Sequence, residues 1–157
     1  MRDSCLLNPV DFDDWTGLLA LLNTSFAYME GRIDPPSSLL RMTADSLKAK
    51  AQNEDLFLIL KDTRPIACLF GIAQEQDYYI GKLAVADAHR GLGLGQALVD
   101  AAAREAYRRG LSALRLETLV ELRENHRAFR AMGFQLIGAS AHKGHSRATS
   151  FTFRRPL

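Results

Sequence analysis

The sequence predicts one α+β domain over residues 1–157, with seven strands and four helices in the order β-α-α-β-β-β-α-β-α-β-β. Two observations support this class. The 157 residues, 47% of them hydrophobic and 24% charged, are enough for a single full core. The spacing of apolar residues also changes repeatedly between helical and extended periods, and no internal repeat, low-complexity segment or linker interrupts the order.

The first half of the chain is expected to hold one strand, two helices and then three strands. An apolar run in residues 4–10 ends at an Asn-Pro pair and predicts the first strand. Residues 11–30 and 38–53 carry apolar residues at helical spacing. Residues 54–85 predict three strands separated by two turns rich in polar residues. The candidate N-caps of the first helix are Asp11 and Asp13.

The second half alternates between the two kinds of element. A small-residue helix is expected from Gly95 to Arg109, followed by Gly110, which suits a helix C-terminus. Residues 111–120 predict a strand, and residues 123–134 a short helix that Gly133 closes. The remaining residues predict a hairpin that turns at Lys143-Gly144.

Composition excludes several classes of protein. A net charge of +2 without a dense run of Lys or Arg argues against a nucleic-acid partner. The apolar runs are too short to cross a membrane, and the N-terminal residues lack a signal-peptide core. Cys5 and Cys68 are far apart in apolar stretches, so they predict buried thiols and a reducing, cytoplasmic location. The oligomeric state stays open, a homodimer included.

The stretch HRGLGLGQAL, residues 89–98, places three glycines before a helix. A P-loop is excluded because Gln96-Ala97 stands where Lys-Ser/Thr is required. A dinucleotide fingerprint fits poorly, since the spacing is G-x-G-x-G and five residues separate it from the strand. A turn without a ligand needs only one glycine. The remaining interpretation is a pyrophosphate cradle at a helix N-terminus, with Arg90 adding charge.

Two motifs in this sequence resemble those of the GNAT superfamily of acetyl-CoA-dependent N-acetyltransferases. LAVADAHRGLGLGQAL resembles the superfamily's acetyl-CoA motif, and ENHRAFRAMGF resembles its later Asn…aromatic…Gly-Phe motif. The clear resemblance runs from Tyr78 to Phe134. It implies a three-layer fold around a mixed, mostly antiparallel sheet, with a splay between the fourth and fifth strands.

The resemblance also implies acetyl-CoA as acyl donor, without a metal. The backbone of the strand end would pair with the pantetheine arm, and the loop N–H groups would hold the pyrophosphate. Asn125 would bond the pantetheine, although a helix cap explains this residue equally well. The expected cofactor-binding residues are Leu83, Ala84, Val85, Arg90, Gly91, Leu92, Gly93, Leu94, Gly95, Gln96, Asn125 and Phe129.

The catalytic groups depart from the family pattern. Phe129 occupies the position at which many members place a tyrosine that protonates the leaving thiolate. Another group then donates the proton, or the thiolate leaves unaided, or the protein only binds acetyl-CoA. Tyr79, at the position of the histone-type glutamate base, is a candidate acid or water-holder, and Glu117 is a candidate base. Their ordinary structural interpretations are a half-buried aromatic and a solvated carboxylate.

The acceptor is expected at the loop between the first two helices, where Glu30, Arg32 and Asp34 offer both signs of charge. An amine-bearing small molecule, an amino acid or a peptide N-terminus would fit. The histidines predict no metal site: His142 and His145 flank a turn without a third ligand, and His126 is expected on a helix surface. The leading hypothesis is therefore an N-acetyltransferase that uses direct transfer. A non-catalytic acyl-CoA-binding module competes with it, and a nucleotide-binding domain is a third interpretation.

Overall fold

The structure is a computed structural model, which describes residues 4–29 and 41–157. Its sheet has seven strands in the order β1-β2-β3-β4-β5-β7-β6. All neighbours are antiparallel except β4 and β5, which run parallel, so the sheet is mixed and mostly antiparallel as predicted. The strands are β1 (Cys5–Leu7), β2 (Asp55–Lys61), β3 (Arg64–Gln74), β4 (Asp77–Val85), β5 (Ala113–Leu119), β6 (Gln135–Ser140) and β7 (Ser150–Pro156).

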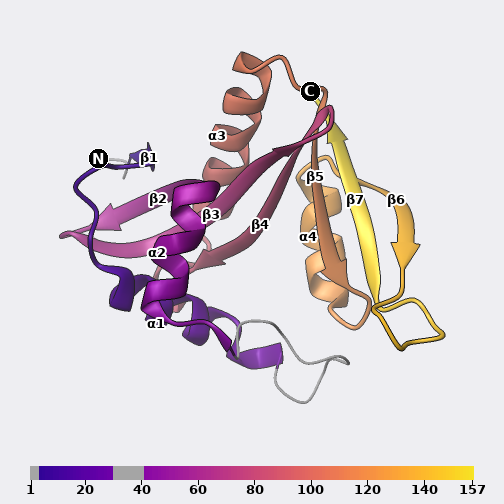
Figure 1. Ribbon diagram of the computed structural model, residues 1–157, viewed down its shortest axis with the longest axis horizontal. Coiled ribbons are helices and arrows are strands. Elements are labelled where there is room, and N and C mark those ends of the chain that lie inside the picture. Colours follow the sequence, from indigo (N-terminus) through magenta and orange to yellow (C-terminus); the bar gives the residue numbers. More distant parts are fainter. Residues whose placement is uncertain (1–3, 30–40) are drawn as a thin grey trace.

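Helices cover both faces of this sheet and make three layers (Figure 1). One apolar cluster packs α3 and α4 against the sheet, and a second packs α1 and α2 against the opposite face of β2 to β4. The helices are α1 (Trp15–Ser25), α2 (Ala44–Asn53), α3 (Leu94–Arg108) and α4 (Arg123–Ala131), and the short 3₁₀ turns are η1 (Ala27–Met29) and η3 (Asp87–His89). The predicted element order is confirmed.

Local sequence explains where the helices begin, with one correction. Asp14, rather than Asp11 or Asp13, caps α1 by accepting a hydrogen bond from the Gly17 N–H at 3.0 Å. Thr43 begins α2 with a capping box to Ser46, so this helix starts later than the apolar spacing predicts. None of the helices in the described ranges has the length and hydrophobicity that crossing a membrane requires.

The two cysteines are free thiols, as expected. Cys68 is fully buried on β3, and burial raises the pKa of its thiol to about 12. Cys5 is half-buried on β1, where burial also raises its thiol pKa. Both thiols are therefore protonated and poorly nucleophilic at neutral pH.

The parallel contact between β4 and β5 is short. It pairs Asp77, Tyr78 and Tyr79 with Ala113, Leu114 and Arg115, and it ends there. Asp77 reinforces this end of the sheet, because Arg154 of β7 donates to both of its carboxylate oxygens at 2.9 and 3.0 Å. These hydrogen bonds lower the pKa of Asp77. Beyond Tyr79 the two strands diverge, which is the predicted splay (Figure 1).

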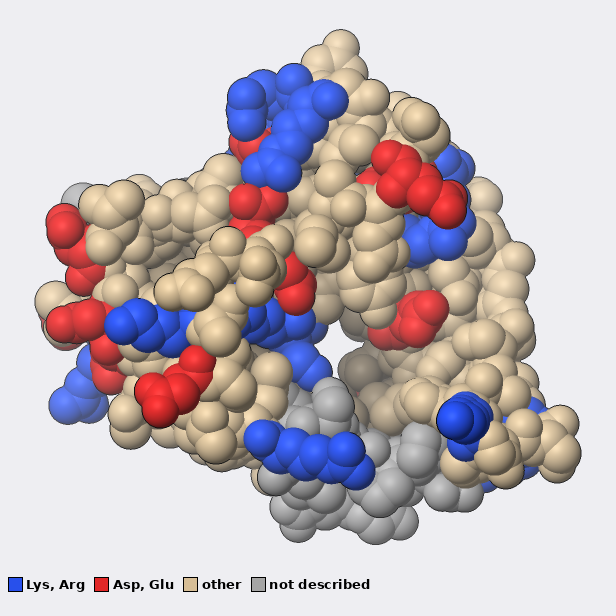
Figure 2. Space-filling model, viewed as in Figure 1, with Lys and Arg blue, Asp and Glu red and all other residues tan. Residues whose placement is uncertain are grey.

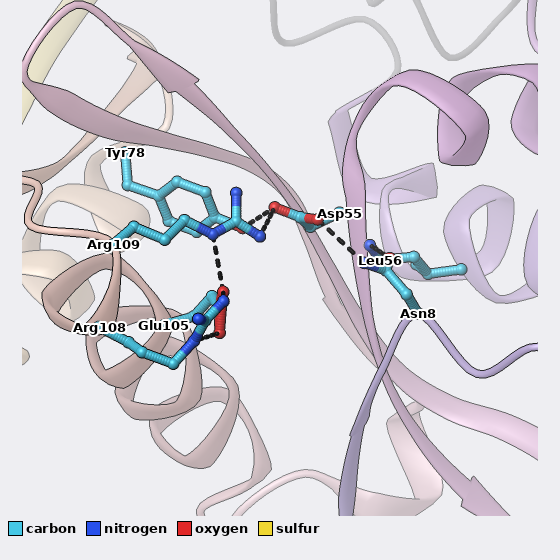
Figure 3. A network of polar contacts seen from close by, with 7 residues as sticks. All are labelled: Asn8, Asp55, Leu56, Tyr78, Glu105, Arg108 and Arg109. Atoms are coloured by element: carbon cyan, nitrogen blue, oxygen red, sulfur yellow. Dashed lines mark hydrogen bonds and ion pairs between the residues drawn. The ribbon is translucent and has the colours of Figure 1, made fainter.

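A polar network ties the C-terminal end of α3 to β2 and β4 (Figure 3). The Tyr78 hydroxyl donates to Asp55 at 2.5 Å, and Arg109 bridges Asp55 at 2.8 Å and Glu105 at 2.7 Å. Arg108 adds a second ion pair to Glu105. Glu105 is only 8% exposed, and its hydrogen bonds from Arg108 and Arg109 lower the pKa of its carboxyl to about 2.

Replacing Glu105 with glutamine is expected to destabilise the fold in a pH-dependent way. Because the folded-state pKa lies below the ordinary value of 4.5, the carboxylate stabilises the protein above about pH 4.5, and this stabilisation is lost as the pH falls toward 2. We expect Glu105→Gln to lower the free energy of unfolding by about 2–3 kcal/mol at neutral pH. Urea denaturation at several pH values checks this, with Glu75→Gln on the exposed β3–β4 turn as control. A difference that is the same at about pH 3 and pH 7 contradicts the assignment.

Candidate active site

The splay between β4 and β5 opens into a cavity of about 1360 Å³. One wall comes from β4, the end of α1 and the loop before α3, and the other comes from β5 and α4. The space-filling view shows a hollow between these two parts of the molecule (Figure 2). The cavity thus joins the glycine-rich loop to the polar side chains of both strands.

The backbone of β4 faces the open side of the splay. Ala86 donates its N–H to the Ile66 carbonyl of β3 at 2.8 Å. Because backbone groups alternate in direction along a strand, the N–H and C=O of Val85 point away from β3 and into the gap, as do those of Leu83. The Val85 carbonyl accepts a hydrogen bond from the Ser25 hydroxyl at 3.3 Å. Leu83, Ala84 and Val85 all line the cavity, where the sequence motif predicts them.

The glycine-rich loop presents open backbone at the start of α3. Gly91 and Gly93 have φ angles of +80° and +77°, and a Cβ atom at either position would meet nothing within 4 Å. Gly93 is the N-cap of α3, and no side chain caps the helix there. The first N–H groups of the helix therefore lack intrahelical acceptors and, with the helix dipole, make a site for an anion. Arg90, half-exposed and paired with Asp87 at 3.0 Å, lies beside them.

The other loop residues differ in what they offer. Gly95 lies within the first turn of α3, where a Cβ atom would be 3.8 Å from Met132 and 3.9 Å from Val85, which is ordinary van der Waals contact. The Gln96 side chain donates to Asp100 at 2.9 Å, and Gln96 also lines the cavity. Leu94 lines the cavity, whereas the Leu92 side chain is 67% exposed outside it.

Helix α4 forms the far wall, and Asn125 does not cap it. The helix begins at Arg123, and its N-cap position is Leu122, which makes no side-chain cap. Instead the Asn125 amide meets the Tyr28 hydroxyl of η1: its Nδ2 donates at 3.2 Å, and its Oδ1 lies 3.4 Å from the same oxygen. One turn later, Phe129 lines the cavity and packs its ring against Phe134 and Phe153.

Tyr79 and Glu117 lie on the face of the splay toward α1 and α2, opposite the buried Tyr78. Tyr79 pairs with Arg115 in the ladder, and Glu117 follows two residues later on the same face of β5. Burial raises the pKa of the Tyr79 hydroxyl, and the negative charge of Glu117 raises it further. The two side chains therefore interact electrostatically across the gap. At neutral pH the Tyr79 hydroxyl is therefore protonated, so it can donate a hydrogen bond but cannot act as a base.

Lys82 and His142 are among the polar residues of the cavity wall that the sequence analysis does not place there. Lys82 sits at an irregularity of the β3–β4 ladder with a φ angle of +55°, and burial lowers the pKa of its ammonium. His142 lines the cavity from the β6–β7 loop, held by the buried hydroxyl of Thr149 through its ring Nδ1 and its backbone N–H. A bulge and a contact between loop and strand have no local sequence signal that would reveal them.

The other histidines also take defined positions. His126 is buried rather than on the surface of α4, because its Nε2 reaches the Leu119 carbonyl at 3.0 Å and its ring packs on Phe151 and Phe153. His89 is half-buried and lines the cavity beside the loop. In the part of the chain that the structure describes, no group of three or more His, Cys, Asp or Glu residues could hold a metal ion. Glu30, Arg32 and Asp34 lie outside the described residues.

The buried Thr118 hydroxyl is evidence that the splay is a ligand site. Thr118 is 7% exposed on β5 and lines the cavity. Its oxygen is buried without a hydrogen-bond partner among the described residues. Buried hydroxyls are nearly always hydrogen-bonded in folded proteins, so an unpaired one facing a cavity suits a polar ligand. With the open β4 backbone and the glycine loop, the site fits an extended molecule that carries amide groups and ends in phosphates.

A splayed parallel strand pair that leads to a glycine-rich helix N-terminus defines the class, a CoA-dependent acyltransferase fold. The sequence matches the family described as "Acetyltransferase (GNAT) family" over residues 15–134, and the chain belongs to this family of acetyltransferases. No protein of curated function matches the sequence.

Solved structures show the same fold. The PaiA N-acetyltransferase from Thermoplasma acidophilum, in complex with coenzyme A, is 12% identical with a TM-score of 0.78, over 98% of this chain and 99% of that one. The ribosomal-protein-S18-alanine N-acetyltransferase from Escherichia coli is 14% identical with a TM-score of 0.69, over 98% and 94% of the two chains. Nourseothricin acetyltransferase is 24% identical with a TM-score of 0.59, over 66% of this chain; the match spans only 65% of that enzyme.

Proposed function

We propose that this protein is an N-acetyltransferase that moves an acetyl group from acetyl-CoA to a primary amine by direct attack in a ternary complex. One observation carries the proposal: a single cavity connects the uncapped N-terminus of α3 to the end of β4 that β5 does not pair with, and then to Glu117 and Tyr79. A donor bound along this path would present its acetyl group to an acceptor entering from the α1 and α2 face. The whole chain would act as one domain.

The proposed donor site uses backbone more than side chains. The N–H groups from Arg90 to Gln96 would hold the pyrophosphate, because they start a helix and surround two glycines without side chains. The N–H and C=O groups of Leu83 and Val85 would pair with the pantetheine arm, as a missing strand would. The Thr118 hydroxyl, which is otherwise buried without a partner among the described residues, would form a hydrogen bond with the same pantetheine arm. A backbone N–H at this end of β4 would polarise the thioester carbonyl.

Glu117 is the proposed base. An acceptor amine arrives mostly protonated, and it must lose a proton before it can attack the thioester carbon. Glu117 is exposed in the cavity and close enough to Tyr79 to raise the pKa of that hydroxyl. A water molecule between Glu117 and the amine could carry the proton, with the Tyr79 hydroxyl holding that water.

Replacing Thr118 with valine is expected to stabilise the free protein and weaken its binding of acetyl-CoA. Valine has nearly the same shape but no unsatisfied hydroxyl, so the free energy of unfolding should rise by about 1 kcal/mol. Loss of the hydrogen bond to pantetheine should raise the Kd of acetyl-CoA by about 3- to 10-fold. Thermal denaturation and calorimetry measure the two effects separately. A Kd that does not change contradicts a contact between Thr118 and the donor.

Release of CoA thiol in the presence of an amine panel tests the proposed function. The panel contains an aliphatic polyamine, free amino acids, an amino sugar and short peptides with a free N-terminus. We expect at least one amine to be acetylated. The fold neighbours named above do not choose among these acceptors, because at their low identities they share the fold alone.

A second candidate, an acyl-CoA-binding module without catalysis, is favoured by one observation. Phe129 offers no proton at the position where the family motif places a tyrosine. Tight binding of acetyl-CoA without thiol release for any amine would select this alternative. Competition by ATP or NAD, but not by CoA, would instead indicate a nucleotide-binding domain.

A further inference from the structure

The end of α1 and the η1 turn that follows it contact both walls of the cavity at the splay. The buried Ser25 hydroxyl meets the Val85 carbonyl on the β4 wall at 3.3 Å. Three residues later, the Tyr28 hydroxyl meets the Asn125 amide on the α4 wall at 3.2 Å. The Tyr28 hydroxyl therefore lies at the first turn of α4, on the lining of the cavity that β4 borders on its other side. It reaches the helix face that also carries Phe129, four residues after Asn125.

Acetyl transfer leaves CoA as a thiolate, which takes up a proton at neutral pH because alkyl thiols ionise near pH 8.5. Phe129 has no proton to give. Hydroxyls of serine and threonine are much weaker acids than a phenol. The phenol of Tyr79 lies on the face where the amine enters, and its raised pKa makes it a poorer donor. Tyr28 differs from these groups, because its phenol lines the cavity at the α4 wall, where the Asn125 amide holds its oxygen by a hydrogen bond.

We propose that Tyr28 is the catalytic residue that protonates the departing sulfur of CoA, with Asn125 as its positioning residue. This inference rests on the proposed acetyltransferase function. As the amine nitrogen bonds to the thioester carbon, the carbon–sulfur bond breaks and the Tyr28 O–H proton moves to sulfur. The first proton of the ammonium group passes through water to Glu117 and on to solvent before attack, and it is the net proton released by the reaction. The second proton leaves the nitrogen as the amide forms, passes to Glu117 by the same water, and returns through solvent to the Tyr28 oxygen, so charge and protons balance over one turnover.

Kinetics of four variants test the role of the hydroxyl. Thiol release is followed with the amine of the panel that reacts fastest, and also with water as acceptor, so that slow hydrolysis of acetyl-CoA gives a second readout. We expect Tyr28→Phe to lower kcat by about 100-fold, with the KM for acetyl-CoA within about twofold. Tyr107→Phe, on the exposed face of α3, is the matched control and should be unchanged.

A tyrosine at position 129 should compensate. Phe129→Tyr alone is measured as the reference for the double variant. Added to Tyr28→Phe, it should recover kcat at least about 10-fold, since position 129 lies one turn from Asn125 on the same wall. A kcat for Tyr28→Phe within threefold of the parent, or no recovery in the double variant, overturns the proposal.

A measurement without turnover tests the contact with sulfur. The protein is labelled with ¹³C at the tyrosine ring carbon that bears the hydroxyl, and the Tyr28 signal is assigned by its absence in Tyr28→Phe. CoA should shift this signal, whereas desulfo-CoA, which lacks the sulfur, should leave it near its free position. Equal shifts with both ligands overturn the proposal. Failure of the proposed function would look different: calorimetry would detect no CoA binding, or the parent protein would acetylate no amine.

Discussion

Replacing Gly93 with glutamate is expected to abolish acetyl-CoA binding while the fold persists. Two effects act together at this position. The φ angle of +77° disfavours any side chain by about 1–2 kcal/mol, and the new carboxylate would stand in the anion site at the start of α3. We expect the affinity to fall by at least about 100-fold, which calorimetry would record as no detectable binding.

The chain supplies a matched control at the other end of the same helix. Gly110 follows α3 with a φ angle of +76°, and a Cβ atom there would also meet nothing within 4 Å. Gly110→Glu therefore carries the same backbone strain and the same added charge, but at the helix C-terminus and away from the cavity. Both variants should lose thermal stability, Gly110→Glu somewhat more because its carboxylate lies at the negative end of the helix dipole, and only Gly93→Glu should lose acetyl-CoA. Equal affinities for the two variants would remove the glycine loop from the donor site.

Glutamine at position 117 is expected to reduce kcat/KM for the acceptor by about 100-fold. The amide keeps the size of the side chain but cannot accept the proton that the amine must lose. The Kd of acetyl-CoA should stay the same, because Glu117 lies on β5 and the proposed phosphate site is at the start of α3. Glu75→Gln, on the exposed turn between β3 and β4, controls for the loss of one negative charge.

The same variant also tests the geometry of the pair. The charge of Glu117 raises the pKa of the Tyr79 hydroxyl, so Glu117→Gln should lower that pKa. Titration of tyrosine absorbance in the parent, in Glu117→Gln and in Tyr79→Phe measures this directly. If kcat/KM is unchanged while the Tyr79 pKa falls, Glu117 faces Tyr79 but accepts no proton from the acceptor.

Local sequence signals predict the fold and the conformation of the glycine-rich loop well. The glycines before α3 are recognisable because positive φ and open backbone need that residue type at fixed positions. The alternation of strands and helices is likewise readable from apolar spacing, and the parallel splay follows from the two motifs that resemble the GNAT pattern. The N-cap of α1 differs from the prediction by one residue, which is the ordinary limit for helix ends.

Contacts between distant segments explain the features that the sequence does not reveal. Asn125 looks like a helix cap, but its partner Tyr28 lies 97 residues earlier. His126 looks like a surface residue because its neighbours on α4 are polar, yet the Leu119 carbonyl at the end of β5 draws its ring inward. Lys82 occupies a bulge whose backbone angle depends on pairing with β3. Each of these features depends on which elements meet in space.

The short ladder between β4 and β5 divides the sheet into two parts, β1 to β4 and β5 to β7, that are hydrogen-bonded at one end only. Three residue pairs and the Asp77–Arg154 ion pair connect the two parts at that end. At the splayed end, Ser25 contacts Val85 of β4 and Tyr28 contacts Asn125 of α4. A donor bound in the splay would hydrogen-bond to both β4 and β5, and would therefore connect the two parts of the sheet at the splayed end as well. At about 100 times its Kd it would then stabilise the fold by about 2.7 kcal/mol. The free energy of unfolding would thus rise with the concentration of acetyl-CoA.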